Sequence, residues 1–289
     1  MSKSVSYSQY SLFRQCPHQW YLTYVKGFRE FKPSIHLTFG TSFHETVQHY
    51  LQVMYEKTGK EADEIELDSY LKERLLENYK QASTNGVHFT TPQELSEFHN
   101  DGIAILNFFK KNRAEYFSKK NTKLVGIEIP INTKASTEIE SITIKGFIDF
   151  VLYSELADRY TIYDIKTSTR GWGDKEKKDQ TKINQILLYK KYFSLLKDVP
   201  EDKIDVVFFI VKRKIPEVSE YPIKRIQEFK PANGTKKVKD AYEDFSEFIN
   251  EVFTKDGEYI EQEYRKNPTK LCHWCPFDNK PDLCDKKIN

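Results

Sequence analysis

Residues 142–167, with the sequence ITIKGFIDFVLYSELADRYTIYDIKT, decide the fold class of this chain of 289 residues. Apolar side chains alternate with other residues along 142–152 and again along 160–167, which predicts two β-strands joined by the short loop 154–159. The same alternation along 125–131 predicts a strand before them. Three successive strands with short connections predict an antiparallel meander.

The rest of the sequence predicts helices around these strands. A helical hairpin is expected over 6–24, and a helix that begins near Gly40 carries an apolar stripe through Phe43, Val47 and Met54. Further elements are helices over 67–79, 93–117, 175–196 and 238–253, a buried strand over 206–211 and an edge strand over 221–226. This succession predicts an α/β fold with a mixed central sheet flanked by helices.

Composition restricts the class of protein. Aromatic residues make up 14% of the chain and charged residues 30%, so we expect a globular protein and not a disordered or collagen-like one. The longest apolar run, 206–211, is far shorter than the roughly 20 residues that cross a bilayer. The first residues lack the apolar segment of a secretory signal. We therefore expect a cytoplasmic protein, in the host cytoplasm if a phage encodes it, with no membrane partner.

The net charge of +2 provides no global field that would draw the chain onto nucleic acid. Basic clusters at 110–113, 119–120, 175–182, 212–214 and 236–239 are typical of solvated faces and only support a binding role. The sequence has no G-X4-G-K-[ST] motif, so we expect neither an ATP-driven motor nor a nucleotide cofactor.

Two aspartates are predicted to face each other across the second and third strands of the meander. The loop length pairs Tyr153 with Tyr160. This register places Asp149 opposite Asp164. Two adjacent carboxylates repel unless a cation neutralises them, and hard oxygen ligands suit Mg²⁺ or Mn²⁺. Lys166 projects from the same strand face, where it can orient an attacking water or stabilise charge on phosphate. The other interpretation is that both aspartates face solvent and pair with lysines.

Residues outside the strands can complete such a site. His44 lies at the edge of its apolar stripe, where it is either a core or capping histidine or a fourth metal ligand. Gln185 and Tyr189 stand four positions apart, so they share one face of the helix after the third strand. Ordinary helix packing explains that pair equally well.

Four short motifs follow one another along the chain. They are Gly40-Thr-Ser-Phe-His44, Gly146-Phe-Ile-Asp149, Asp164-Ile-Lys166-Thr167 and Gln185-Ile-Leu-Leu-Tyr189. In order and spacing they resemble the motifs of the RecB-type branch of the PD-(D/E)XK nucleases. The resemblance implies a restriction-endonuclease-like α/β core with a helical insertion, and a metal held by His44, Asp149, Asp164 and the Ile165 carbonyl.

The resemblance also implies roles for the neighbouring polar residues. Lys166 would assist the attacking water, and Gln185 and Tyr189 would contact DNA or support the site. Asp164 stands where many members of the branch have glutamate, and this shorter side chain alters the spacing to a metal. Glu128 has a comparable position in the family but no assigned role.

Four cysteines, one near the start of the chain and three near its end, predict a metal centre, because disulfides are rare in cytosolic proteins. The pair Cys272-X2-Cys275 fits zinc and iron–sulfur equally well, and His18 or His273 would complete a zinc site. Free thiols in a core are the third interpretation.

The residues around these cysteines extend the resemblance. Ser6-Tyr-Ser8 precedes Cys16-Pro17, and Cys284 follows the pair of cysteines. This pattern is similar to the iron–sulfur variety of the branch, which includes AddB nuclease domains, CRISPR-associated RecB-like exonucleases and the exonuclease V group. The resemblance implies a [4Fe-4S] cluster that joins the two ends of the chain, with zinc as the alternative, held by Cys16, Cys272, Cys275 and Cys284.

We therefore expect four regions and one activity. The regions are N-terminal helices over 1–57, a helical cap over 58–120, a nuclease core over 121–255 and an iron–sulfur segment over 256–289. The expected activity is a metal-dependent DNA exonuclease on single strands, in the 5′-to-3′ direction by resemblance. The alternatives are a non-catalytic DNA-binding or assembly subunit of a recombination or integration complex, and a structure-specific endonuclease. A helicase, recombination or CRISPR-adaptation partner fits this branch.

An aromatic and basic segment follows the third strand. Trp172 could stack on bases of a single strand while Lys175, Lys178 and Lys182 contact its phosphates. Plain packing explains Trp172 equally well.

Overall fold

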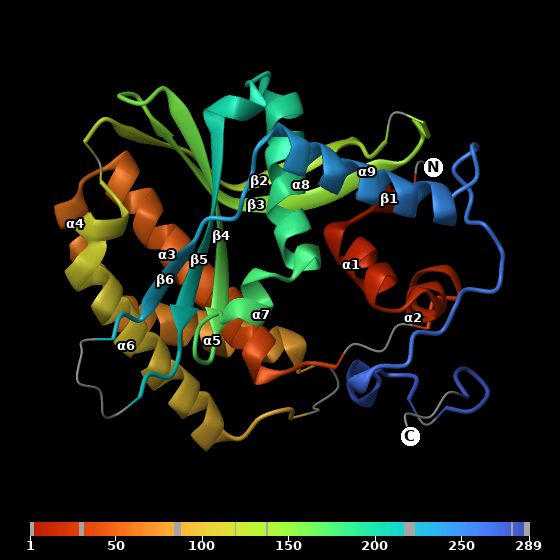
Figure 1. Cartoon of the computed structure of the whole chain (residues 1–289). Coiled ribbons are helices and arrows are strands. Elements are labelled where there is room, and N and C mark those ends of the chain that lie inside the picture. Colours follow the sequence, from red (N-terminus) through yellow and green to blue (C-terminus); the bar gives the residue numbers. More distant parts are fainter. Residues whose placement is uncertain are drawn as a thin grey trace. The chain divides into compact units, whose positions relative to one another are not determined.

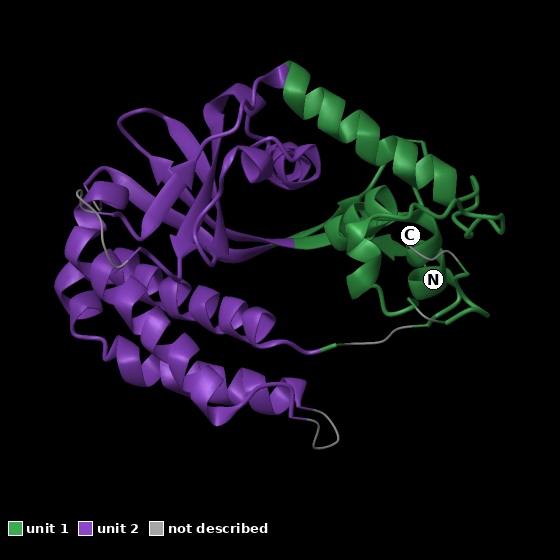
Figure 2. Ribbon diagram, turned by 60° about the horizontal axis from the view of Figure 1, so that its bottom comes forward, with its two compact units in different colours: residues 1–32, 130–146, 236–289 green, residues 33–129, 147–235 purple. Residues whose placement is uncertain are grey.

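The computed structural model describes residues 3–28, 32–83, 88–118, 120–136, 138–216, 223–278 and 280–285 (Figure 1). The chain forms two compact units (Figure 2). The sheet unit comprises residues 33–129 and 147–235, and the terminal unit comprises residues 1–32, 130–146 and 236–289.

A sheet with parallel and antiparallel pairs is the framework of the sheet unit. Strand β3 (Thr143–Ser154) pairs with β2 (Thr122–Lys134) and, antiparallel, with β4 (Arg159–Ser168). Strand β5 (Ile204–Lys212) runs parallel to β4, and β6 (Ile226–Phe229) pairs antiparallel with β5. The connection between β4 and β5 contains α7 (Asp174–Lys177) and α8 (Gln180–Lys197), as a parallel pair requires a crossover.

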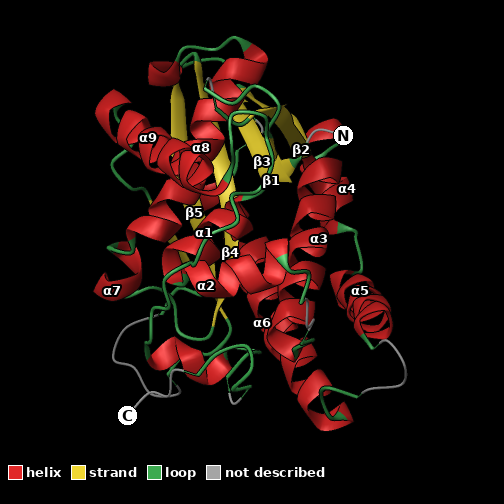
Figure 3. Ribbon diagram, turned by 90° about the vertical axis from the view of Figure 1, so that its right-hand side faces the viewer, coloured by secondary structure: helices red, strands yellow, loops and turns green. Residues whose placement is uncertain are grey.

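Helices cover both faces of this sheet (Figure 3). Helix α8 lies on one face, where its Phe193 contacts the ring of Tyr160 at 5.6 Å between centroids. The other face is covered by α3 (Ile35–Glu56) and α6 (Pro92–Tyr116), and α5 (Leu67–Ala82) packs on both of these helices. The short helix α4 (Gly59–Asp63) lies between α3 and α5 in the chain.

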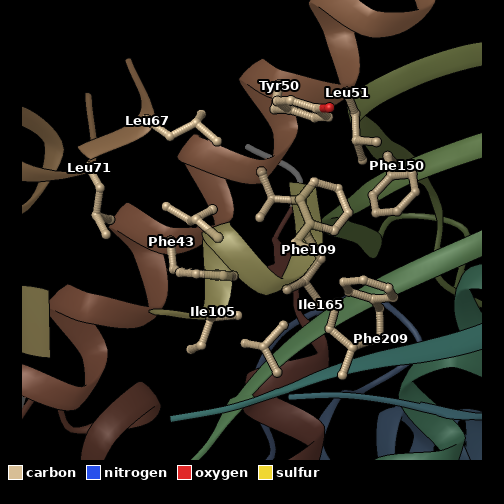
Figure 4. Close-up of a cluster of buried hydrophobic side chains, with 14 of the residues drawn as sticks. Phe43, Tyr50, Leu51, Leu67, Leu71, Ile105, Phe109, Phe150, Ile165 and Phe209 are labelled. Atoms are coloured by element: carbon tan, nitrogen blue, oxygen red, sulfur yellow. The ribbon is translucent and has the colours of Figure 1, made fainter. Parts of the chain in front are cut away.

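The apolar core of the sheet unit lies between the sheet and α3 (Figure 4). Phe43 from α3, Phe109 from α6 and Ile165 and Phe209 from the strands are buried there. Because alternate residues of a strand point to opposite faces, this apolar set leaves the even-numbered residues of β4, Asp164 and Lys166 among them, on the face of α8.

The terminal unit brings both ends of the chain together. Its helices are α1 (Tyr7–Gln15), α2 (Pro17–Trp20), the π-helical turn η1 (Tyr21–Val25) and most of α9 (Thr235–Val252), and the 3₁₀ turn η4 is Lys270–Trp274. Strand β1 (Ser4–Val5) pairs in parallel with the first residues of β3. Trp20 is fully buried among aromatic rings of α9 and the following segment, with Phe248 at 5.9 Å and Tyr264 at 5.4 Å.

Most predicted elements are present, with differences at their ends. The expected meander pairs as predicted at β3 and β4, and the strand expected over 206–211 is β5. The helix expected near Gly40 begins at Ile35, since the Ser34 hydroxyl accepts the Leu37 N–H at 3.3 Å and caps it there.

Two further boundaries were wrong. The helix expected over 175–196 is interrupted between α7 and α8, because Asp179 caps α8 by accepting the N–H groups of Thr181 and Lys182. The edge strand expected over 221–226 is β6, Ile226–Phe229, and residues 221–222 lie outside the described residues. No helix in the described part of the chain is long and apolar enough to cross a membrane.

The tight contact of α6 with α3 and α5 depends on Gly102, and we predict that Gly102→Ala destabilises the protein. A methyl group there would lie 2.5 Å from Leu71 Cδ2 and 3.1 Å from Phe39 Cε2, and both side chains are buried. Alanine normally stabilises a helix interior relative to glycine, but this overpacking reverses the sign, and we expect a loss of about 1–3 kcal/mol.

Denaturant unfolding measures this loss. Asn107→Ala, at an exposed position of the same helix, is the matched control and should change the free energy of unfolding by less than about 0.5 kcal/mol. A Gly102→Ala protein as stable as the wild type would show that α6 does not pack this closely.

Candidate active site

Strands β3 and β4 separate where the two predicted aspartates lie. The observed register pairs Tyr153 with Tyr160, as predicted, and continues to Phe150 opposite Tyr163. One residue further on, the Asp149 side chain replaces the strand contact, because its Oδ2 accepts the backbone N–H of Ile165 at 2.6 Å. The sheet therefore opens beside Asp164, and a carboxylate satisfies the freed N–H group.

Asp164 is the most enclosed charged group of this opening. Its side chain is 2% exposed, and its Oδ2 lies 2.7 Å from the Lys166 Nζ. This contact lacks hydrogen-bond geometry, so among the described residues Oδ2 has an ion-pair neighbour but no hydrogen-bond donor. Burial is the main cause that raises the pKa of Asp164 to about 6, against the opposing effect of Lys166. The carboxyl of Asp149 lies nearby and is largely buried. Burial also raises its pKa to about 6.

Lys166 is held between a carboxylate and an amide. Its ammonium donates to Gln185 Oε1 at 2.9 Å, and Gln185 in turn donates from Nε2 to the Tyr189 hydroxyl at 3.0 Å. Both partners come from α8, on the face that their spacing predicted. Tyr189 is buried, and its pKa lies above the ordinary value because of burial and the nearby charge of Asp164.

His44 reaches the same opening from α3. Its Nδ1 lies 3.5 Å from Asp149 Oδ2, and its ring is close enough to the Ile165 backbone to hydrogen-bond with it. Burial and the Lys166 charge lower the pKa of His44 to about 4, which favours the neutral imidazole. A neutral imidazole next to a carboxylate and a backbone carbonyl is a suitable set of donors for a divalent cation.

Two residues that sequence reasoning did not assign also belong to this site. Gln48, one turn after His44 on α3, is buried and donates to Glu128 Oε1 at 2.5 Å and to the Asp149 carbonyl at 3.2 Å. Glu128 has a φ of +48° inside β2, a left-handed conformation that is unusual for a residue with a side chain. Its negative charge acts to raise the pKa of His44 and of Asp149.

The signal for Gln48 was present in the sequence, because it stands four positions after His44 on the same helical face. We assigned Gln48 no role because the residues around it form the apolar stripe of the helix.

The residues expected to contact DNA, Trp172 and the lysines that follow it, differ in how exposed they are. Trp172 is 9% exposed and packs on Phe208 at 4.8 Å between ring centroids, and its backbone N–H donates to Gln227 Oε1 at 2.8 Å. This burial favours packing over base stacking for Trp172. Lys175 and Lys178 are exposed, and the half-buried Lys182 lies over the Trp172 ring at 5.3 Å and 3.7 Å from Asp179 Oδ2.

The four cysteines gather in the terminal unit. Cys16, Cys272, Cys275 and Cys284 line one pocket. Two hydrogen bonds bring their segments together: the His18 backbone N–H donates to the Arg265 carbonyl at 3.1 Å, and the Asn267 side chain donates from Nδ2 to the Gln15 carbonyl at 2.8 Å.

The Cys275 thiol lies near other polar groups of this pocket. Burial and the proximity of Cys16 and Cys284 raise its pKa, while the backbone N–H groups of Phe277 and Asp278 act in the opposite direction by hydrogen-bonding to the sulfur. The thiols are therefore close enough to influence one another.

The carboxylates beside Lys166 and the four cysteine thiols are both chemically suited to bind metals. A buried carboxylate with an unsatisfied oxygen, next to a second and largely buried one, needs a cation, and four thiols in one pocket suit zinc or iron. Over the described ranges, however, no three His, Cys, Asp or Glu side chains are drawn together closely enough to form a ready-made metal-binding group. Lys166 and the Ile165 N–H occupy the aspartates instead.

An α/β sheet that holds a buried aspartate, a largely buried one and a lysine at a strand opening is suited to the hydrolysis of phosphate esters. A sequence profile of the PD-(D/E)XK nuclease superfamily matches residues 4–280. The chain therefore belongs to the PD-(D/E)XK nuclease superfamily. No curated protein matches the chain.

Because burial opposes the ionised form of Asp164, we predict that Asp164→Asn stabilises the metal-free protein. The folded-state pKa of about 6 exceeds the ordinary value, so the ionised carboxylate destabilises the folded chain at any pH above about 6. A neutral amide of the same shape removes this cost, and at pH 7 the free energy of unfolding should rise by about 1–3 kcal/mol.

Unfolding in EDTA tests this gain. Asp158→Asn, in the exposed β3–β4 loop, is the matched control and should not raise stability, because Asp158 hydrogen-bonds Tyr153 and Lys203. If Asp164→Asn unfolds more readily than the wild type in EDTA, the ion pair with Lys166 outweighs the cost of burial.

Proposed function

We propose that this member of the nuclease superfamily is a divalent-cation-dependent deoxyribonuclease of the RecB-like branch that shortens single-stranded DNA from an end. The observation that carries the proposal is the pair of aspartates beside Lys166, Asp164 buried and Asp149 largely buried, at an opening of the sheet. The four motifs in order support the branch, and the absence of a nucleotide-binding motif in the sequence fits a nuclease without its own motor.

Four groups would hold Mg²⁺ or Mn²⁺ in this proposal: the Asp149 and Asp164 carboxylates, the His44 imidazole and the Ile165 carbonyl. When bound, the cation supplies neutralising charge to the phosphate and lowers the pKa of a water molecule. The aspartates need only exchange their present partners, Lys166 and the Ile165 N–H, for the cation. This exchange accounts for two carboxylates in a place where their ionised forms are otherwise unfavourable.

Lys166 positions and stabilises the reacting phosphate. In the metal-free structure its ammonium contacts Asp164 Oδ2 and donates to Gln185 Oε1, and Gln185 would hold it on the face of β4 when the cation replaces it at Asp164. In this position it can donate to a phosphate oxygen, or to the attacking water, as negative charge develops. The Gln185–Tyr189 hydrogen bond limits the rotation of the amide that holds it. These two α8 residues therefore position Lys166.

Single-stranded DNA is the proposed substrate because a chain without a motor cannot feed a duplex into the site. Lys175 and Lys178 are exposed, and with Lys182 they are candidates for phosphate contacts. Helicase, recombination or CRISPR-adaptation proteins would supply the single strand. The 5′-to-3′ direction rests on the resemblance alone.

A nuclease assay on end-labelled DNA tests this function. Linear single strands should be shortened from the 5′ end only with Mg²⁺ or Mn²⁺, and circular single strands of the same sequence should survive. Asp149→Ala, Asp164→Ala and Lys166→Ala should each lower the rate by roughly a thousandfold or more, because transition-state stabilisation is lost. Asp158→Ala, in the exposed β3–β4 loop, is the control and should retain activity.

Each result of this assay decides between the alternatives. Rapid cutting of circles would assign a structure-specific endonuclease. Binding of DNA without cleavage in either metal would assign a non-catalytic assembly subunit. Full activity of Asp164→Ala would overturn the proposed site.

We also propose that the four cysteines hold a [4Fe-4S] cluster that stabilises the terminal unit. The supporting observations are their common pocket, the Thr269 N–H directed at Cys272 Sγ at 3.3 Å and the amide hydrogen bonds to Cys275. Such N–H groups stabilise thiolate ligands of a cluster. Because Cys16 lies at the start of the chain and the other cysteines near its end, cluster binding would stabilise the folded state.

Metal analysis tests the cluster. Protein purified without oxygen should be brown and contain about four iron atoms per chain. Cys16→Ser should lower iron content and melting temperature, whereas Gln19→Ala, a change in the same pocket that removes no sulfur, should preserve the iron. One zinc per chain and no iron would replace the cluster with a zinc site.

A further inference from the structure

A basic pocket lies at the end of β4 and β5, outside the proposed active site. It has a volume of about 490 Å³ and is lined by Arg170, Lys212, Lys214, Ile215, Pro216 and Ile223. This volume falls within the range of roughly 300–1,000 Å³ that is usual for small-molecule sites. Part of the wall is apolar and part is cationic, which suits a nucleotide, with its sugar or base against the isoleucines and its phosphate against the cations.

The cations of this pocket differ in whether their charge is already balanced. Lys214 lies 2.7 Å from Glu97 Oε1 and 3.1 Å from Asp101 Oδ2, so its charge is paired. Lys212 and Arg170 form no ion pair within the described ranges. Burial lowers the pKa of Lys212, which is half-buried and has no anionic partner in the part of the chain that the structure describes. An anionic ligand would remove that cost.

A tight loop fixes Arg170 beside Lys212. The Ser168 hydroxyl donates to the Gly171 carbonyl at 3.0 Å and accepts the Gly171 N–H at 3.1 Å, so the loop that carries Arg170 is closed on itself. Gly171 has a φ of +94°, and a Cβ there would lie 2.9 Å from Lys212 Cδ. The loop therefore rests on the aliphatic part of the Lys212 side chain, and only glycine allows this contact.

The strand register places the Lys212 side chain of this pocket on the same sheet face as Asp164. Asp164, Lys166 and Ser168 alternate along β4, and their β5 partners are Phe208, Ile210 and Lys212. Paired residues of parallel strands point to the same face. Lys212 thus follows Lys166 by two residues along the strand direction, or roughly 7 Å. A single strand of DNA whose scissile phosphate lies at Lys166 would bring a neighbouring phosphate to Lys212.

We propose that Arg170 and Lys212 form a phosphate subsite for single-stranded nucleic acid, next to the cleavage position. This inference rests on the proposed function, because it assumes that the reacting phosphate lies at Asp164 and Lys166. The subsite holds the substrate in register, so it contributes to binding and not to the chemical step. The ligand is a phosphodiester within the strand that is cut.

The first experiment measures binding of a fluorescent single-stranded oligonucleotide in EDTA at several salt concentrations. The Arg170→Ala/Lys212→Ala double variant should bind about tenfold more weakly or worse, since two charged hydrogen-bond donors are lost. The slope of log affinity against log salt should fall by about 0.7 per lost contact, roughly 1.4 in all. Arg170→Lys/Lys212→Arg should keep most of the wild-type slope.

Lys203→Ala is the matched control. Lys203 lies just before β5 at its opposite end and pairs with Asp158, so this variant loses one positive charge far from the pocket. Its affinity and salt slope should remain close to those of the wild type. An equal loss in Lys203→Ala would show that the double variant acts through net charge, and would overturn the subsite.

The second experiment replaces single phosphates of the oligonucleotide by neutral methylphosphonates, one position at a time. At one linkage near the cleavage position, the replacement should weaken binding to the wild type and have little further effect on the double variant. The same variant should raise KM with little change in kcat. Independent, additive effects at every linkage, as expected if the pocket takes a free nucleotide, would overturn the proposal.

Different results refute the subsite and the proposed function. A wild-type protein that binds no single strand contradicts the proposed function and the subsite together. A wild type that binds and cuts DNA, with a double variant of equal affinity and slope, refutes the subsite and leaves the proposed function intact.

Discussion

The enclosure of two carboxylates, Asp164 buried and Asp149 largely buried, at one opening of the sheet is the constraint on which the rest of the site depends. Water is excluded from Asp164, so its ionised form needs other compensation, and the protein provides it in part. Lys166 approaches Asp164, and the Ile165 N–H approaches Asp149. Because strands β3 and β4 separate there, the same gap frees the N–H group and admits the side chain that satisfies it. The separation of the strands therefore also determines where the Asp149 carboxylate lies.

Helix α3 serves the core and the site at once. Phe39, Phe43 and Val47 are buried on its apolar face, while His44 and Gln48 direct polar groups at Asp149. The helix also buries hydroxyl groups: Ser42 and Thr46 donate to carbonyls four residues earlier at 2.8 and 2.7 Å, so they need no outside partner. Small side chains of this kind allow a helix to pack closely. The position of His44 thus follows from the same packing that stabilises the sheet unit.

The sequence predicted those parts of the site that follow from strand periodicity, and missed those that depend on a local distortion. Asp149 and Asp164 were predicted because the length of the β3–β4 loop determines the register. Glu128 received no role because regular alternation would not specify its direction; its left-handed φ of +48° is a bulge-like distortion that no apolar pattern reveals. The start of α3 at Ile35 was missed for a related reason, since a serine cap extends the helix beyond its apolar stripe.

The three consecutive cations at 212–214 explain why a basic cluster in a sequence does not by itself define a binding site. Arg213 turns to the helical layer, where it lies 2.7 Å from Asp101 Oδ2 and 3.7 Å from the centre of the Phe98 ring, and so holds α6 against β5. Lys214 pairs with the same aspartate. Lys212, at the last position of β5, points to the opposite face and has no acidic partner among the residues described. One run of charge at the end of β5 thus contains two cations that pair with acidic residues of α6 and one, Lys212, with no such partner among the described residues, and only Lys212 has charge available for a ligand.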